Sequence, residues 1–102
     1  MGSYKNVDEI YRELKQKASE LETATRIEGF EENTEDTIVE QRIEIYFEKP
    51  VTEYIELELR RVIQGEGWDI TVNEQNVQFV KTLDLGDVLP MYDICFVEKD
   101  SV

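Results

Sequence analysis

The chain has 102 residues, of which 24 are acidic and 11 are basic, giving a net charge of −13 at pH 7. This length predicts a single domain over residues 1–102, and the negative charge disfavours direct binding to nucleic acid or to anionic lipid headgroups. There is no apolar run of eighteen residues and no secretory signal pattern, so we expect a cytoplasmic protein without a membrane segment.

The N-terminal third predicts a helix followed by a strand. Asn6 and Glu9 have the spacing of a capping box, and apolar residues then recur at helical spacing, which predicts a helix over residues 7–22. The β-favouring stretch over residues 23–29 predicts a strand. The polar run "EENTED", residues 31–36, predicts a turn after that strand.

The middle of the chain predicts a strand and then a second helix. Over residues 39–47 the odd positions are mostly apolar and the even positions mostly charged, which is typical of a half-buried antiparallel strand. Pro50 ends this strand, and an apolar stripe then predicts a helix that ends at the Gly65–Gly67 segment. The stripe contains Val51, Tyr54, Ile55, Leu59 and Val62. Leu57 and Ile63 lie at its margins, so we expect both to be partly exposed.

The C-terminal third predicts three strands. In order, the elements expected are a strand over residues 68–72, a turn over 73–76, a strand over 77–83, a loop over 84–90 and a strand over 92–96. Phe79 and Val80 should lie on opposite faces, because successive residues of a strand alternate.

This order predicts an α+β fold in which two helices pack on one face of an antiparallel sheet of four or five strands. The order helix, strand, strand occurs twice, which suggests duplicated units over residues 5–50 and 51–100. "RIEIYFEKP", residues 42–50, is echoed by "YDICFVEKD", residues 92–100. Convergent patterning is the alternative, since any two amphipathic units share apolar spacing. If the halves are related by a twofold axis, a groove between them is a natural binding site.

The residue types that usually carry catalysis are missing. The chain has no histidine, and its one cysteine, Cys95, lacks a catalytic partner. The Gly65–Gly67 segment lacks the spacing and the lysine of a phosphate-binding loop, and "EENTED" and "DLGDV" lack the spacing of a calcium loop. We therefore expect a protein that is not an enzyme and binds no cofactor or metal. Carboxylate-dependent hydrolysis is the remaining catalytic alternative.

Negative charge is concentrated between Glu28 and Glu48, where eight acidic residues accompany Arg42 alone. Such an array favours a protein partner with a basic surface, although charged edge strands also serve simply to prevent aggregation. The exposed Leu57 of the second helix adds an apolar contact for a partner or a second copy. The candidate partner-binding residues are Glu31, Glu32, Glu35, Asp36, Glu40, Glu44, Glu48 and Leu57.

A small, acidic, histidine-free chain with the segments "RIEIYFEKP" and "YDICFVEKD" resembles in kind the orphan accessory proteins of viruses and phages. These include proteins of archaeal viruses and some anti-CRISPR proteins. The resemblance implies a protein that binds a host protein in the host cytoplasm, in some cases by imitating the charge of DNA. It implies no role for any individual residue of this chain.

The leading hypothesis is a non-enzymatic protein–protein interaction module that uses its acidic surface or the groove between its halves. A DNA-mimic inhibitor of a nucleic-acid-binding protein is the alternative within this class. A structural protein that self-associates, for example as a homodimer through the sheet edge or the second helix, is the alternative from a different class.

Overall fold

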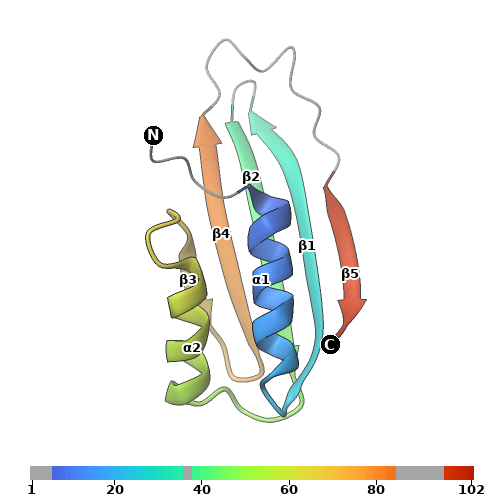
Figure 1. Ribbon diagram of the computed structural model, residues 1–102. Coiled ribbons are helices and arrows are strands. Elements are labelled where there is room, and N and C mark those ends of the chain that lie inside the picture. Colours follow the sequence, from blue (N-terminus) through green and yellow to red (C-terminus); the bar gives the residue numbers. More distant parts are fainter. Residues whose placement is uncertain (1–5, 36–37, 85–95) are drawn as a thin grey trace.

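Two helices cover one face of a five-stranded antiparallel sheet (Figure 1). The computed structural model describes residues 6–35, 38–84 and 96–102, with side chains for all of these except 33–35. The elements are α1 (Val7–Ser19), β1 (Ala24–Glu35), β2 (Ile38–Phe47), α2 (Glu53–Ile63), β3 (Asp69–Val72), β4 (Asn76–Asp84) and β5 (Val97–Ser101). The strand order is β3-β4-β2-β1-β5, which confirms the predicted α+β class. Neither of the helices described is long and apolar enough to cross a membrane.

Helix α1 begins at the predicted capping box. The Asn6 side chain accepts a hydrogen bond from the Glu9 backbone N–H at 2.9 Å, and the Glu9 carboxylate accepts one from the Asn6 backbone N–H at 3.3 Å. Its buried face consists of Val7, Ile10, Tyr11, Leu14 and Ala18. The helix ends at Ser19, earlier than predicted. The chain turns after this residue, and the Ala24 N–H donates a hydrogen bond to the Leu21 carbonyl at the start of β1.

Strand β1 is longer than the sequence predicted. It runs from Ala24 to Glu35 and so includes most of the segment expected to form a turn. Its pairing with β2 continues until Glu35 lies opposite Ile38, with a register shift after Asn33. The turn prediction was wrong because hydrogen bonds to β2 satisfy the backbone of this polar segment, and one face of the sheet is open to water.

Strand β2 confirms the predicted alternation. Its odd positions, Val39, Gln41, Ile43, Ile45 and Phe47, are buried on the helix side, and none of its even positions is buried. Gln41 is polar, but its side-chain amide donates a hydrogen bond of 2.5 Å to the Glu31 carboxylate on the same face. A buried amide is tolerated where its hydrogen bonds are made.

Helix α2 buries part of the predicted apolar stripe together with one residue that was expected to be partly exposed. The buried residues are Ile55, Leu59 and Ile63, which recur every four residues. Ile63 is only 6% exposed, so its predicted exposure was wrong, whereas Tyr54, placed in the stripe, is 65% exposed. Successive helical residues are turned by about 100°, so Tyr54 and Ile63 lie on opposite sides of the helix. The buried face is therefore rotated away from Tyr54 and toward Ile63. Leu57 is 57% exposed, as predicted.

The boundaries of α2 follow from local chemistry. The Thr52 hydroxyl accepts a hydrogen bond from the Ile55 N–H at 3.3 Å, which caps the first turn. Gly65 and Gly67 have φ values of 79° and 82°, a region that residues with a Cβ atom rarely adopt. The two glycines therefore end the helix, as predicted, and lead through the buried Trp68 into β3.

The two halves of the chain meet at the centre of the sheet, where β2 pairs with β4 from Ile38 opposite Asp84 to Tyr46 opposite Asn76. Residues 42–47 lie in this central strand, whereas the described part of the echoing segment leads into β5, an edge strand. The two echoing segments thus occupy different places, and duplicated units are not confirmed. Asp84, the first residue of the predicted loop over 84–90, is the last residue of β4. The rest of that loop and most of the predicted strand over 92–96 lie outside the described residues, and β5 begins at Val97.

Edge strand β5 is attached to the core by Tyr11 of α1. The Tyr11 hydroxyl donates to Asp100 Oδ2 at 2.7 Å, and Lys15 Nζ lies 3.4 Å from Asp100 Oδ1. The hydrogen bond from Tyr11, supported by Lys15, holds the pKa of Asp100 below its ordinary value, while burial and the Asp100 carboxylate raise the pKa of Tyr11. The tyrosine ring also packs edge-on against Phe96, with ring centres 5.5 Å apart.

Replacing Tyr11 with phenylalanine should therefore lower the melting temperature in a pH-dependent way. A carboxylate whose pKa is lowered in the folded state adds stability above its unfolded pKa of about 3.9, and this stability is lost as the pH falls through the lower folded value. The difference in melting temperature between wild type and Y11F should be full at pH 6 and shrink below about pH 4. Y54F, at the exposed tyrosine of α2, is the matched control and should match wild type throughout. A Y11F deficit that stays constant down to about pH 2 would show that Asp100 is not the partner that matters.

Candidate functional site

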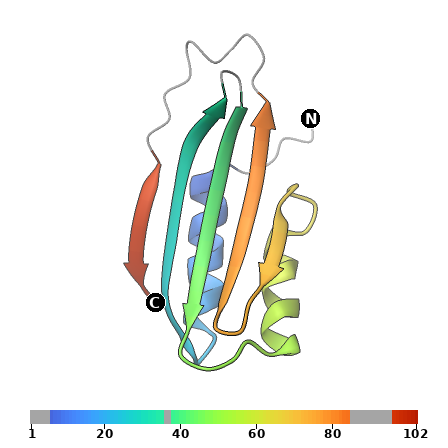
Figure 2. The same ribbon diagram turned by 180° about the vertical axis from the view of Figure 1, so that it is seen from behind.

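The face of the sheet opposite the helices, here called the helix-free face, is seen directly in Figure 2. Its composition follows from the strand register, because alternate residues of a strand share a face. Its described charged side chains are Glu28, Glu32, Glu40, Glu44, Asp69, Asp84, Arg26, Arg42 and Lys99. Six carboxylates thus accompany three basic side chains, so this face is acidic.

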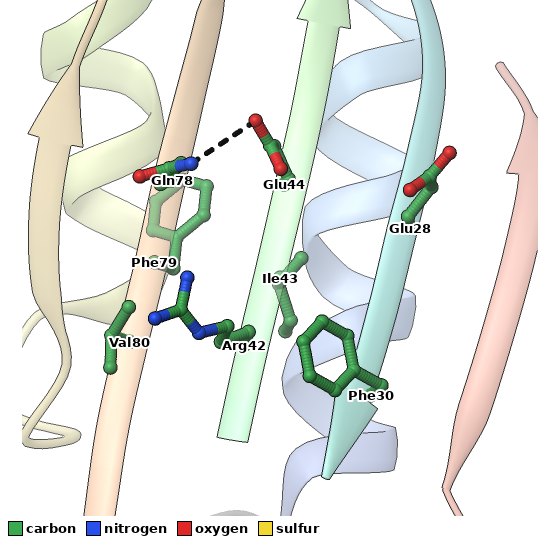
Figure 3. Close-up of a pocket in the computed structure, with 8 residues that line it drawn as sticks. All are labelled: Glu28, Phe30, Arg42, Ile43, Glu44, Gln78, Phe79 and Val80. Carbon is green, nitrogen blue, oxygen red and sulfur yellow. Dashed lines mark hydrogen bonds between the residues drawn. The ribbon is translucent and has the colours of Figure 1, made fainter. Parts of the chain in front are cut away.

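A shallow hollow of about 50 Å³, here called the central hollow, lies on this face over β1, β2 and β4 (Figure 3). Phe30 and Val80 line it from the two flanking strands, and the aliphatic stem of Arg42 lies between them in the same cross-strand row. Phe30 is 37% exposed, and its neighbour in β5, Val97, is 66% exposed. An exposed row of apolar surface therefore crosses the middle of an acidic face.

Two pairs of like charges flank this row. Glu28 lies directly opposite Glu44, and Glu32 lies directly opposite Glu40, in the pairing of β1 with β2. Like charges that face each other across neighbouring strands destabilise a sheet. A positive charge relieves such a pair, whether a basic residue of the face itself or a partner above the face supplies it.

The arginines of the face reach one carboxylate of each pair. Arg26 Nε lies 3.2 Å from Glu28 Oε2, and its guanidinium group lies over the Tyr46 ring, 4.0 Å from the ring centre. Arg42 forms an ion pair with Glu40. Burial raises the pKa of Tyr46 above its usual value, although Arg26 opposes the shift, so the phenol is neutral at neutral pH.

The other carboxylate of each pair, Glu44 or Glu32, is not neutralised by a cation. Glu44 accepts hydrogen bonds from the side-chain amides of Gln78, at 3.3 Å (Figure 3), and of Asn76. Glu32 is exposed at the surface. Within residues 6–35, 38–84 and 96–102, no lysine or arginine forms an ion pair with either carboxylate. One carboxylate without an ion pair in the described part of the chain therefore lies on each side of the apolar row, and on the Glu44 side Lys99 lies opposite Glu28.

The predicted partner-binding residues do not form one surface. The structure brings together Glu32, Glu40 and Glu44 on the helix-free face. Glu31 lies on the helix side, and Glu48 lies beyond the end of β2. Leu57 belongs to the helical layer, on the other side of the sheet. The side chains of Glu35 and Asp36 lie outside the described residues.

Sequence reasoning placed Val80 on the face opposite Phe79 but missed Phe30 and Val97. Phe30 was not assigned to a strand, because β1 was predicted to stop near Gly29. Reading the alternation further would have found it, since Glu28, Phe30 and Glu32 point one way and Ile27 and Gly29 the other. The pairing of Phe30 with Val97 has no signal in a single sequence, because it depends on which strands become neighbours.

The central hollow is small compared with the pockets of most enzymes. Glu28 and Glu44 are a carboxylate pair in a concave site, but a volume of about 50 Å³ is far below the roughly 300 Å³ or more of small-molecule pockets. A glycoside hydrolase needs room for a sugar ring between its two acids. Among the residues that the structure describes, no group of three or more histidine, cysteine or acidic side chains is placed to hold a metal ion.

A buried lysine on the opposite side of the sheet was also missed. Lys81 is 8% exposed, and burial lowers its pKa, an effect that Glu66 opposes. It lies beneath the loop after α2, where its Cε would be 3.6 Å from a Cβ atom added to Gly67. Since it faces the helical layer, it does not contribute to the central hollow.

The candidate site is identified from the geometry and charge of the helix-free face. Comparison with protein-family models, with curated proteins and with solved structures gave no match for the chain.

Proposed function

We propose that the chain is a non-enzymatic module that binds a basic surface of a protein partner with the helix-free face of its sheet. The observation that carries the proposal is the central hollow, where an exposed apolar row lies between two opposed pairs of carboxylates. Apolar contacts supply affinity at the centre of an interface, and charges around them guide and orient the partner. The net charge of −13 adds long-range attraction for a positively charged protein.

The size of the helix-free face supports this use. Strands lie about 4.8 Å apart and rise about 3.3 Å per residue, so β1, β2 and β4 with their shorter neighbours present roughly 600 Å². A standard protein complex buries roughly 800 Å² on each partner. The face therefore provides most of such a surface, and the ends of the strands can supply the rest.

The exposed apolar pair on α2 is the competing surface. Tyr54 and Leu57 lie one turn apart on the helix and are 65% and 57% exposed. The groove beside Leu57 is also lined by Arg60 and Arg61, whose ion pairs with Glu56 and Glu58 leave it without the surplus of carboxylates found on the helix-free face. The helix-free face has the charge match that this groove lacks, so we assign the partner to the sheet.

Imitation of DNA is supported less well than recognition of a protein. A mimic of the phosphate backbone needs carboxylates in an uninterrupted row, but Arg42 lies between Glu40 and Glu44 on β2 and forms an ion pair with Glu40. Mixed signs of charge around an apolar centre are typical of protein interfaces. Given the resemblance in kind to accessory proteins of viruses and phages, a host protein is the natural partner.

Two serine substitutions distinguish the surfaces. Phe30→Ser removes the exposed aromatic side chain beside the central hollow, and Leu57→Ser removes a more exposed apolar side chain from α2. The measurement is the affinity of each variant for the partner that the wild-type chain captures from a lysate of its source. We expect F30S to weaken binding by about tenfold or more, which is typical of an aromatic residue at an interface centre, and L57S to bind like wild type.

The same samples test the charge argument. Raising the salt concentration from about 50 to about 300 mM should weaken the wild-type complex, because exposed charges are screened over a shorter distance. Circular dichroism spectra that match wild type ensure that F30S is folded. An F30S variant that is folded and binds normally, or a complex that is indifferent to salt, would disprove the proposed function.

A further inference from the structure

The charges of the helix-free face have a spacing that a partner must match. Glu28 and Glu32 lie four residues apart on β1, with Phe30 midway between them on the same face. Four residues of a strand span about 13 Å, and residues two apart lie about 7 Å from each other. The acid pairs are therefore about 13 Å apart, and the apolar row crosses the strands halfway between them.

Among the residues that the structure describes, each end of this array keeps one carboxylate that forms no ion pair with a lysine or arginine. At one end it is Glu44, which is held in place by two amide donors, and at the other it is Glu32, which is exposed. Arg26 and Arg42 already form ion pairs with the opposing residues Glu28 and Glu40. The face can therefore accept one added cation at each end, with an apolar side chain between them.

An extended segment presents this pattern, and a helix does not. In an extended chain, residues i, i+2 and i+4 point to one side and lie about 7 and 13 Å from the first. On a helix, residues on one side lie about 6 Å apart at i+4 and about 11 Å apart at i+7. An extended segment thus reproduces both the distance between the acid pairs and the central position of the apolar row.

On the basis of the proposed function, we infer that the helix-free face binds an extended basic segment of the partner protein, in which two basic side chains flank an apolar one in the order basic, any residue, apolar, any residue, basic. The two cations contact the Glu44 and Glu32 ends, and the apolar side chain packs against Phe30 and Val80. The segment lies over the exposed side chains of the sheet and runs along the strands. It therefore does not pair with the edges of β3 and β5.

Two synthetic peptides of equal composition test this inference. The peptide TRTVTRT has arginines four residues apart with valine between them, and TTRRVTT has the same residues with adjacent arginines. Fluorescence anisotropy with a labelled peptide gives the dissociation constant. We expect TRTVTRT to bind wild type about tenfold more tightly than TTRRVTT, a difference of about 1.4 kcal/mol.

Matched variants of the chain locate the binding. E32Q/E44Q removes the two carboxylates that lack a cation and should abolish the preference for TRTVTRT. E22Q/E74Q removes two exposed carboxylates outside the sheet face, so its net charge equals that of E32Q/E44Q. It should keep the preference for TRTVTRT. Because E32Q/E44Q also relieves repulsion between opposed carboxylates, its melting temperature should equal or exceed that of wild type, which excludes unfolding as the cause.

The outcomes separate this inference from the proposed function. Equal affinity for both peptides, or no binding of either, would overturn the extended-segment inference and leave the partner captured through Phe30 unaffected. A preference for TRTVTRT that E22Q/E74Q abolishes and E32Q/E44Q retains would overturn the inference as well. Loss of the preference in E32Q/E44Q alone supports it.

Discussion

Replacing Phe79 with alanine is expected to lower the free energy of unfolding by about 3–5 kcal/mol, because it leaves a large cavity in the middle of the core. Phe79 is fully buried in β4, opposite Ile43 of β2 and Ile70 of β3. Small domains are stable by only about 5–15 kcal/mol, so this change removes a large part of the total. Urea unfolding followed by circular dichroism measures the loss.

Two valines of the same strand provide the matched control. Val77 is fully buried on the helix side, whereas Val80 is half-buried on the helix-free face. V77A should therefore cost clearly more stability than V80A, although both remove the same two methyl groups. Equal costs, or a greater cost for V80A, would show that β4 is shifted by one residue, which would exchange the two faces of the sheet.

Replacing Gly29 with valine is expected to cost about 1–3 kcal/mol by overfilling the core. A Cβ atom at this position would lie 2.9 Å from Cδ2 of Tyr11 and 2.9 Å from Cε2 of Phe96, closer than carbon atoms can approach. Both rings would have to move, and their edge-on contact, at an interplanar angle of 72°, would be disturbed. Gly29 is therefore required for space and not for its backbone conformation, since its φ is not positive.

A size series at this position makes the test specific. Thermal unfolding should show a smaller loss for G29A than for G29V, because the second substitution adds two more methyl groups to the same crowded place. Gly65 is the contrasting position: no atom lies within 4 Å of an added Cβ, but its φ is +79°. G65A should therefore lose stability through backbone strain and not through crowding. A G29V variant as stable as wild type would mean that Tyr11 and Phe96 do not pack over β1.

Elements with strong local periodicity could be predicted from the sequence. The capping box placed the start of α1, and strict alternation placed β2 and the faces of Phe79 and Val80. In these elements the apolar residues that share one face by their spacing are buried together. The α+β class followed because two amphipathic helices and several half-buried strands can share a core only as layers.

The remaining errors arose where neighbours decide the outcome. The "EENTED" segment is polar, yet most of it extends β1 because β2 supplies hydrogen bonds along its length. Similarly, a stripe through Ile55 and Leu59 can extend toward Tyr54 or toward Ile63, and only packing against the core decides that Ile63 is buried. Local sequence cannot choose between such alternatives, because the deciding contacts come from distant residues.

The sequence predicted an acidic surface but not which residues form it. The acidic segment from Glu28 to Glu48 supplies four of the six described carboxylates of the helix-free face, but Glu31 points to the helices. The opposed pairs depend on the register of β1 against β2, which a single sequence does not give. The exposed apolar row likewise combines residues from β1, β2, β4 and β5, which become neighbours only in the folded sheet.

The most direct test of a partner on the helix-free face is an NMR titration of the ¹⁵N-labelled chain with the purified protein that it captures. Our account predicts that the largest shift changes fall on central residues of β1, β2 and β4, with Phe30, Arg42, Glu44 and Val80 among them, while both helices change little. Changes centred on Tyr54 and Leu57 of α2, with the sheet unaffected, would contradict it.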